Sequence, residues 1–133
     1  MASPGLESYA RSVLRLVIGF TFTCHGCQKL LGLFGGMGGR GARAHLFSLM
    51  WVAGCIETIG GVLILLGLFT VPVAFILCGE MAVAYFMQHY PHGLFPIRNG
   101  GELAVLYCFI FLYLLAAGPG VVSLDSLIRR KRH

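Results

Sequence analysis

The amino-acid sequence predicts an all-α integral membrane protein, a four-helix bundle that forms one domain over residues 1–133. The chain is 57% hydrophobic and only 11% charged, and its mean hydropathy is +0.82. A soluble domain carries roughly 25% charged residues, so this chain has too few to cover a surface that faces water. The same composition excludes a disordered chain, a coiled coil and a nucleic-acid-binding module. Because a helical span needs about 20 apolar residues, the chain has room for four spans joined by short loops.

The first three apolar stretches define the first half of the predicted bundle. The stretch at about 13–34 lacks a short apolar core followed by a small-residue cleavage site, so we expect a retained span and not a signal peptide. A glycine-rich connection over 35–43 follows it. The stretches at about 47–69 and 71–90 are almost continuous, and Pro72 lies at the start of the third. These two spans are therefore predicted to form a tight helical hairpin.

The third connection, over 89–101, holds two prolines, two histidines, one asparagine and three glycines. Such a segment is long for a simple link between helices, which favours an ordered functional loop. The fourth span, at about 101–118, stops at Gly118-Pro119-Gly120. A short amphipathic segment with a basic tail then ends the chain.

Basic side chains gather at the ends of the predicted spans. Four spans place both termini on one side of the membrane, together with Arg11, Arg15, Arg129, Arg130, Lys131 and Arg132. The opposite side receives Lys29, Arg40, Arg43 and Arg98. Since loops on the cytoplasmic side carry an excess of Lys and Arg, we expect cytoplasmic N- and C-termini and external loops at 35–43 and 89–101. The net charge of +5 is thus explained by topology, and no nucleic-acid partner is predicted.

Two acidic residues, Glu57 and Glu80, mark a candidate site within the membrane. Each lies near the middle of its span, where a charge costs at least about 2.5 kcal/mol and needs a partner or a proton. On the first span, His25 and Lys29 share one helical stripe with Arg11, Arg15, Ile18 and Phe22. These spacings predict a polar cluster of His25, Lys29, Glu57, Glu80 and Glu102.

A structural role for these charges is the alternative, because buried ion pairs can fix helix register without any chemistry. The glycines that face the spans, Gly19, Gly54, Gly60 and Gly61, allow a neighbouring helix to approach closely. That approach could occur within one bundle or between the two protomers of a homodimer, and the sequence leaves both open.

Cys24 and Cys27 form a C-x-x-C motif inside the first span. Redox motifs of this kind usually lie at a helix N-terminus, where free N–H groups stabilise the thiolate, so the pair is only a secondary redox candidate. No two histidines are spaced at i and i+4, and we predict no metal site. Aromatic residues cluster in the second half of the chain, which indicates either an interfacial belt or a pocket for a flat ring such as a quinone, with His89 or Glu102 near its mouth.

Several motifs, taken in order, resemble the DoxX family of small four-helix bacterial membrane proteins. They are His25-Gly26-x-x-Lys29-Leu30-x-Gly32, Glu57-x-x-Gly60-Gly61-x-Leu63, Gly67-Leu68-x-Thr70-x-Pro72 and His89-x-Pro91-x-Gly93-x-x-Pro96-x-x-Asn99-Gly100-Gly101-Glu102-x-Ala104-x-Leu106-Tyr107. The resemblance extends over about 14–125 and implies a multi-pass protein of the bacterial cytoplasmic (inner) membrane. It also implies a link to quinone-dependent oxidoreductases and redox-stress complexes.

The resemblance places His25, Lys29, Glu57, Asn99 and Glu102 at family motif positions, whereas Cys24 and Cys27 lie outside the pattern. Glu80 is a candidate because of its burial in the membrane. We therefore expect catalytic roles for His25, Lys29, Glu57 and Glu102. Substrate contacts are expected for Glu80, His89, Asn99 and Tyr107.

Three functions are consistent with these residues. In the first, the protein is the membrane subunit of an oxidoreductase that binds a quinone as substrate at its external face. Its electrons then come from a soluble or membrane redox partner protein, because the sequence has no evident electron carrier. In the second, it is a non-catalytic scaffold or assembly factor embedded in the lipid bilayer. The third is a small proton-linked carrier, suggested by the two intramembrane carboxyls.

Overall fold

The computed structural model describes residues 4–132, and helices make up its regular structure apart from one isolated β-bridge between Met37 and Ala42. The long helices are α1 (Pro4–Leu31), α2 (Leu49–Leu66), α3 (Thr70–Ala84) and α5 (Glu102–Ala117). The shorter elements are a π-helical turn η1 (Tyr85–His89), a 3₁₀ turn η2 (Tyr90–His92), α4 (Pro96–Asn99) and the C-terminal α6 (Leu124–Lys131). The predicted all-α class is confirmed.

The helix boundaries follow local signals. The first helix begins well before the predicted span, and its first turns are supported by an ion pair at i and i+4 between Glu7 and Arg11, 3.0 Å apart. It ends at Leu31, because Gly32 adopts a φ of +69° that terminates an α-helix. Ser48 caps α2 by accepting a hydrogen bond from the backbone N–H of Trp51 at 3.2 Å.

Two helical stretches are long and apolar enough to cross a membrane. They are Leu49–Leu66 and the continuous run Thr70–His92, which includes η1 and η2. Glu102–Ala117 is also apolar but shorter. All four long helices expose large apolar side chains, for example Phe20, Ile59, Phe75 and Phe109. A surface of this kind suits lipid better than water.

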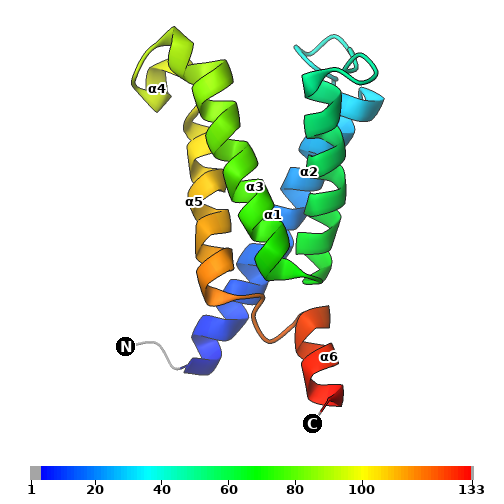
Figure 1. Ribbon diagram of the computed structural model, residues 1–133, viewed down its shortest axis with the longest axis vertical. Coiled ribbons are helices and arrows are strands. Elements are labelled where there is room, and N and C mark those ends of the chain that lie inside the picture. The colour runs from blue at the N-terminus through cyan, green and yellow to red at the C-terminus, as the bar shows by residue number, and fades with distance from the viewer. Residues whose placement is uncertain (1–3, 133) are drawn as a thin grey trace.

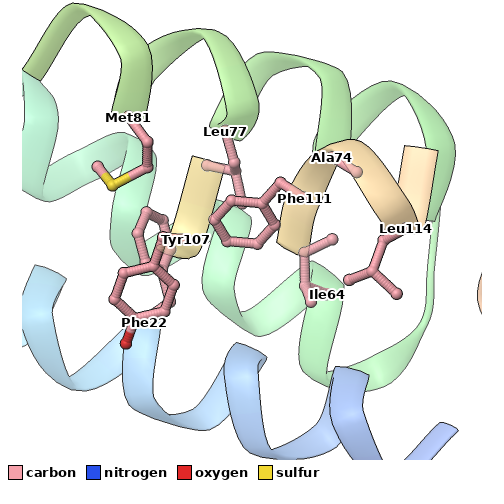
Figure 2. Close-up of a cluster of buried hydrophobic side chains, with 8 residues drawn as sticks. All are labelled: Phe22, Ile64, Ala74, Leu77, Met81, Tyr107, Phe111 and Leu114. Carbon is pink, nitrogen blue, oxygen red and sulfur yellow. The ribbon is translucent and has the colours of Figure 1, made fainter. Parts of the chain in front are cut away.

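The long helices form two pairs, α1 with α2 and α3 with α5. Figure 1 shows both chain ends at the same end of the molecule, and the two pairs diverge toward the opposite end, which carries the α1–α2 loop and α4. Between the pairs lies the buried core. Figure 2 shows its members, Phe22, Ile64, Ala74, Leu77, Met81, Tyr107, Phe111 and Leu114. The ring of Phe22 meets those of Tyr107 and Phe111 edge-on, at centroid distances of 5.0 and 4.9 Å.

The C-terminal segment joins the helices at the end where the two pairs meet. Arg15 is 1% exposed, and its guanidinium donates hydrogen bonds to the carbonyls of Ile64, Leu65, Pro119 and Val122. Asp125 accepts from the backbone N–H groups of Phe69 and Thr70, each at 3.0 Å, and so caps the N-terminus of α3. The basic amphipathic end expected from the sequence is α6, whose last turn carries Arg129, Arg130 and Lys131.

Candidate functional site

A cavity of about 460 Å³ lies between the two helix pairs. Much of its wall is apolar, formed by side chains that include Phe22, Leu49, Met50, Ala53, Met81, Val83, Ala84, Met87, Leu103 and Ala104. The polar side chains that reach it are His25, Lys29, Glu57, Glu80, Gln88, His89 and Tyr107. A volume of several hundred Å³ with apolar walls and a few convergent polar groups is typical of small-molecule sites.

Lys29 of α1 and Glu57 of α2 form an ion pair at the cavity, in which Lys29 Nζ donates to Glu57 Oε1. Glu57 is 2% exposed, and its second oxygen, Oε2, has no hydrogen-bond partner among residues 4–132. A buried acceptor without a donor is costly, so Oε2 is available to a ligand that brings one.

A seam of glycines brings this ion pair together. Gly19 and Gly26 of α1 lie against Gly54 and Gly61 of α2, and a Cβ at Gly26 would come within 2.5 Å of the Thr58 nitrogen. The backbones of α1 and α2 are thus in direct contact, as in small-residue packing of membrane helices. These glycines pack inside one chain and therefore carry no argument for a homodimer.

Glu80 of α3 reaches the same cavity from the other helix pair. Both of its carboxylate oxygens are buried, and within the part of the chain that the structure describes neither has a hydrogen-bond partner. The cavity thus holds two carboxyl groups, Glu57 and Glu80, with three oxygens not bonded to protein, against a single lysine. A ligand with hydrogen-bond donors fits this balance.

His25 and Tyr107 form a further part of the wall. Their rings meet edge to face at a centroid distance of 5.8 Å. The Tyr107 hydroxyl donates to Thr21 Oγ1 at 2.9 Å, which fixes the orientation of the phenol ring. The imidazole of His25 is therefore held beside an aromatic surface formed by Phe22 and Tyr107.

The third connection is ordered, as predicted, and Asn99 organises it. Its side-chain amide donates to the Tyr85 hydroxyl at 3.2 Å and to the Gly93 carbonyl at 2.8 Å, while its Oδ1 accepts from Gly101 N–H at 2.8 Å. His89 Nδ1 lies 3.2 Å from the Asn99 carbonyl, and the His89 side chain lines the cavity. The π-helical turn that carries His89 is a feature often found at functional sites.

The structure brings together six of the predicted site residues: His25, Lys29, Glu57, Glu80, His89 and Tyr107. It leaves the other four outside the cavity wall. Asn99 bonds within the loop, and Glu102 lies exposed in the first turn of α5, neither of them in the cavity wall. Cys24 and Cys27 are free thiols on α1, also outside that wall.

Sequence reasoning missed the contribution of Gln88 and of the methionines in the wall. Helical spacing could have found Met87 and Gln88, because Ala84, Met87 and Gln88 follow Glu80 at i+4, i+7 and i+8 and all line the cavity. A second missed feature is a contact between the thiols of Cys78 and Cys108, in α3 and α5.

A family model for DoxX matches residues 10–90. This segment contains the ion pair Lys29–Glu57, together with His25 and Glu80. The chain belongs to the DoxX family. An "Uncharacterized protein" of Haemophilus influenzae is 44% identical over 127 residues, which cover 92% of this chain and 93% of the relative. No solved structure shows a significant match.

Membership of the DoxX family and the two long apolar helices together identify a membrane protein. Six of the cavity's seven polar side chains lie within the DoxX match, and Tyr107 lies beyond it, as do Asn99 and Glu102 outside the cavity. The family match thus covers the α1–α2 pair and α3, which form most of the cavity wall.

Proposed function

We propose that this DoxX-family protein is a multi-pass protein of the bacterial inner membrane and the membrane subunit of a quinone-linked oxidoreductase or redox-stress complex. In this arrangement α1 and α5 cross the bilayer beside α2 and α3, and both termini lie in the cytoplasm. The apolar side chains that all four helices expose support the four spans. Electrons reach the site from a soluble or membrane redox partner protein.

The observation that carries the proposal is the composition of the cavity. Its walls are apolar and aromatic, while His25, Lys29, Glu57 and Glu80 reach it from both helix pairs. A quinone ring combines apolar and polar parts in the same way, since its flat faces are apolar and its two oxygens form hydrogen bonds. The ring fits against Phe22 and Tyr107, and the oxygens fit the polar groups.

Quinone reduction consumes two electrons and two protons, so the site needs groups that donate and accept protons. His25 and Lys29 supply N–H donors for a quinone carbonyl. The carboxyl oxygens of Glu57 and Glu80 that lack protein partners accept from the hydroxyls of the hydroquinone. Lys29 also stabilises the negative charge that develops on a ring oxygen as electrons arrive.

Binding of a short-chain benzoquinone to the purified protein in lipid nanodiscs tests the proposal. Native mass spectrometry measures occupancy for the wild type and for His25→Ala and Glu80→Leu. His25→Ala removes an N–H donor to a quinone carbonyl, and Glu80→Leu removes acceptors for the hydroquinone hydroxyls. We expect His25→Ala to weaken binding of the quinone, and Glu80→Leu to weaken binding of the corresponding hydroquinone, each about ten-fold, equivalent to about 1.4 kcal/mol.

Glu102→Gln is the matched control, because Glu102 is an exposed carboxyl outside the cavity wall. It should bind quinone as the wild type does. A wild type that binds no quinone, or equal binding by all four proteins, would contradict the proposal.

One observation favours a second candidate function, that of a non-catalytic scaffold. Lys29 and Glu57 join the two helices whose backbones touch along the glycine seam, so the pair can serve α1–α2 assembly alone. In that case replacing both residues with apolar ones of similar size leaves cellular function intact wherever the protein still folds. The quinone proposal instead expects function to be lost in the folded double variant.

A further inference from the structure

Two cysteine side chains from different helices meet inside the bundle. Cys78 Sγ of α3 lies 3.7 Å from Cys108 Sγ of α5, and Cys108 Sγ also lies 3.5 Å from the Cys78 carbonyl oxygen. All five cysteines of the chain are free thiols in this structure. The contact is separate from the C-x-x-C motif of α1, and the residues are 30 positions apart in the sequence.

The position of these thiols suits formation of a bond between them. A disulfide has a sulfur–sulfur distance of about 2.0 Å, so the two sulfurs must approach by less than about 2 Å, a shift within the range of side-chain rotation. The helices that carry them are already held together by core residues such as Leu77 and Phe111. The two side chains therefore meet across an interface that is already packed.

The surroundings determine which oxidant can act there. Cys78 and Cys108 are half-buried and pack against the hydrophobic core, within two helices that expose apolar side chains such as Phe75 and Phe109. A water-soluble oxidant is excluded from such a place, whereas a lipid-soluble quinone reaches it. Quinones are known to accept electrons from protein thiols in the bacterial envelope.

The thiol pair also lies close to the cavity along the chain. Met81 lines the cavity one helical turn after Cys78, and Ala104 lines it one turn before Cys108. The same two helices thus connect the thiols to the cavity wall.

We propose that Cys78 and Cys108 are a redox-active dithiol that closes to a disulfide between α3 and α5 and reduces a quinone. Two S–H bonds break and one S–S bond forms. The two electrons and two protons that are released convert one quinone to one hydroquinone. The inference rests on the proposed function in taking a quinone as the electron acceptor and in placing α3 and α5 in the membrane. The dithiol is then the carrier within the chain, and the redox partner protein reduces it again after each turnover.

The test uses a variant that retains only these two thiols, with Cys24→Ser, Cys27→Ser and Cys55→Ser. The protein is reduced, freed of reductant, placed in lipid nanodiscs and incubated with a short-chain benzoquinone. Maleimide labelling after denaturation then counts free thiols by mass, and absorbance measures hydroquinone. We expect both thiols to become unreactive and one hydroquinone to form per protein.

The matched control retains Cys55 and Cys108, with Cys24→Ser, Cys27→Ser and Cys78→Ser, and its thiols should remain reactive. The same reaction is run on wild-type protein, so that a result caused by misfolding of the serine variants can be recognised. Because Arg98 lies between Cys78 and Cys108, tryptic digestion without reductant should give two peptides joined by the disulfide.

The outcomes separate this inference from the proposed function. If mass spectrometry shows bound quinone while both thiols remain reactive, the dithiol is overturned and the quinone site stands. If the thiols are oxidised while mass spectrometry finds no quinone bound, the dithiol is supported and the cavity proposal is contradicted. If quinone neither binds nor oxidises the pair, both fail.

Discussion

The Lys29–Glu57 pair is the residue-level feature with the largest expected effect on stability. Burying both charges is costly, but removing one leaves the other without compensation in a site shielded from water. We predict that Lys29→Met lowers the free energy of unfolding by about 3–5 kcal/mol. The double variant Lys29→Met with Glu57→Leu should recover most of this loss. Unfolding in mixed micelles, followed by circular dichroism, measures both values.

Glu102→Gln provides the control, since an exposed charge contributes within about 0.5 kcal/mol. The pair has no structural role if Lys29→Met is as stable as this control. If the double variant is as unstable as Lys29→Met, the loss reflects side-chain packing and not the unpaired charge.

Arg15 supports the structure by a different route, because its guanidinium bonds to backbone carbonyls of two separate segments. The planar fork of arginine suits several acceptors at once, and the single ammonium of lysine cannot replace it. We predict that Arg15→Lys costs at least about 2 kcal/mol, close to the value of one or two charge-assisted hydrogen bonds. The same unfolding measurement applies, and the exposed Arg129→Lys should change little. Equal stability of the two variants would argue against this role.

Single residues also show how far sequence reasoning can identify the site. The acids within predicted spans and the stripe on the first span indicated His25, Lys29, Glu57 and Glu80, and all four side chains line the cavity. Glu102 was expected in the same cluster. It lies five residues before Tyr107 on one α-helix, so its side chain points about 140° away from that of Tyr107 around the helix axis. Since Tyr107 faces the interior, Glu102 is directed outward. A family motif specifies which residue type occupies a position, whereas the place of that residue around the helix determines which way its side chain points.

The α1–α2 pair shows at the element scale how small residues set helix separation. A Cβ at Gly26 would lie 2.2 Å from Thr58 Oγ1 and 2.5 Å from the Thr58 nitrogen, whereas one at Gly79 of α3 meets nothing within 4 Å. We predict that Gly26→Ala destabilises the protein by at least about 2 kcal/mol, because the helices must separate. Gly79→Ala should be neutral or stabilise by up to about 1 kcal/mol.

Thermal unfolding of the two alanine variants in the same detergent compares them directly. The close packing of α1 and α2 would be contradicted if Gly26→Ala melted at the wild-type temperature. Separation of these helices should also weaken the Lys29–Glu57 pair, so quinone occupancy of Gly26→Ala is a second readout for the proposed site.

The divergence of the two helix pairs is a property of the whole molecule that the sequence did not reveal. The apolar stretches predicted the helices, and the almost continuous stretches at 47–69 and 71–90, with Pro72 at the start of the third, predicted a hairpin of α2 and α3. The angle between the pairs depends instead on which side chains meet across them. Gly60 lets Leu77 approach α2 near the hairpin, while the cavity occupies the space further along. The angle between the helix pairs therefore depends on how side chains of different size pack in three dimensions, and the hydrophobic pattern of the sequence does not contain this information.

The orientation of the whole molecule in the membrane determines which compartment the diverging end faces. Both chain ends lie at the end where the pairs meet, and the basic residues of α6 lie there too (Figure 1). The excess of cytoplasmic Lys and Arg predicts that alkaline phosphatase fused to the C-terminus is inactive. The same enzyme inserted between Gly38 and Gly39 should be active, since this loop lies at the opposite end. Activity of the C-terminal fusion alone would reverse the topology. The diverging end and the loop around Asn99 would then face the cytoplasm, and the redox partner would have to be sought there.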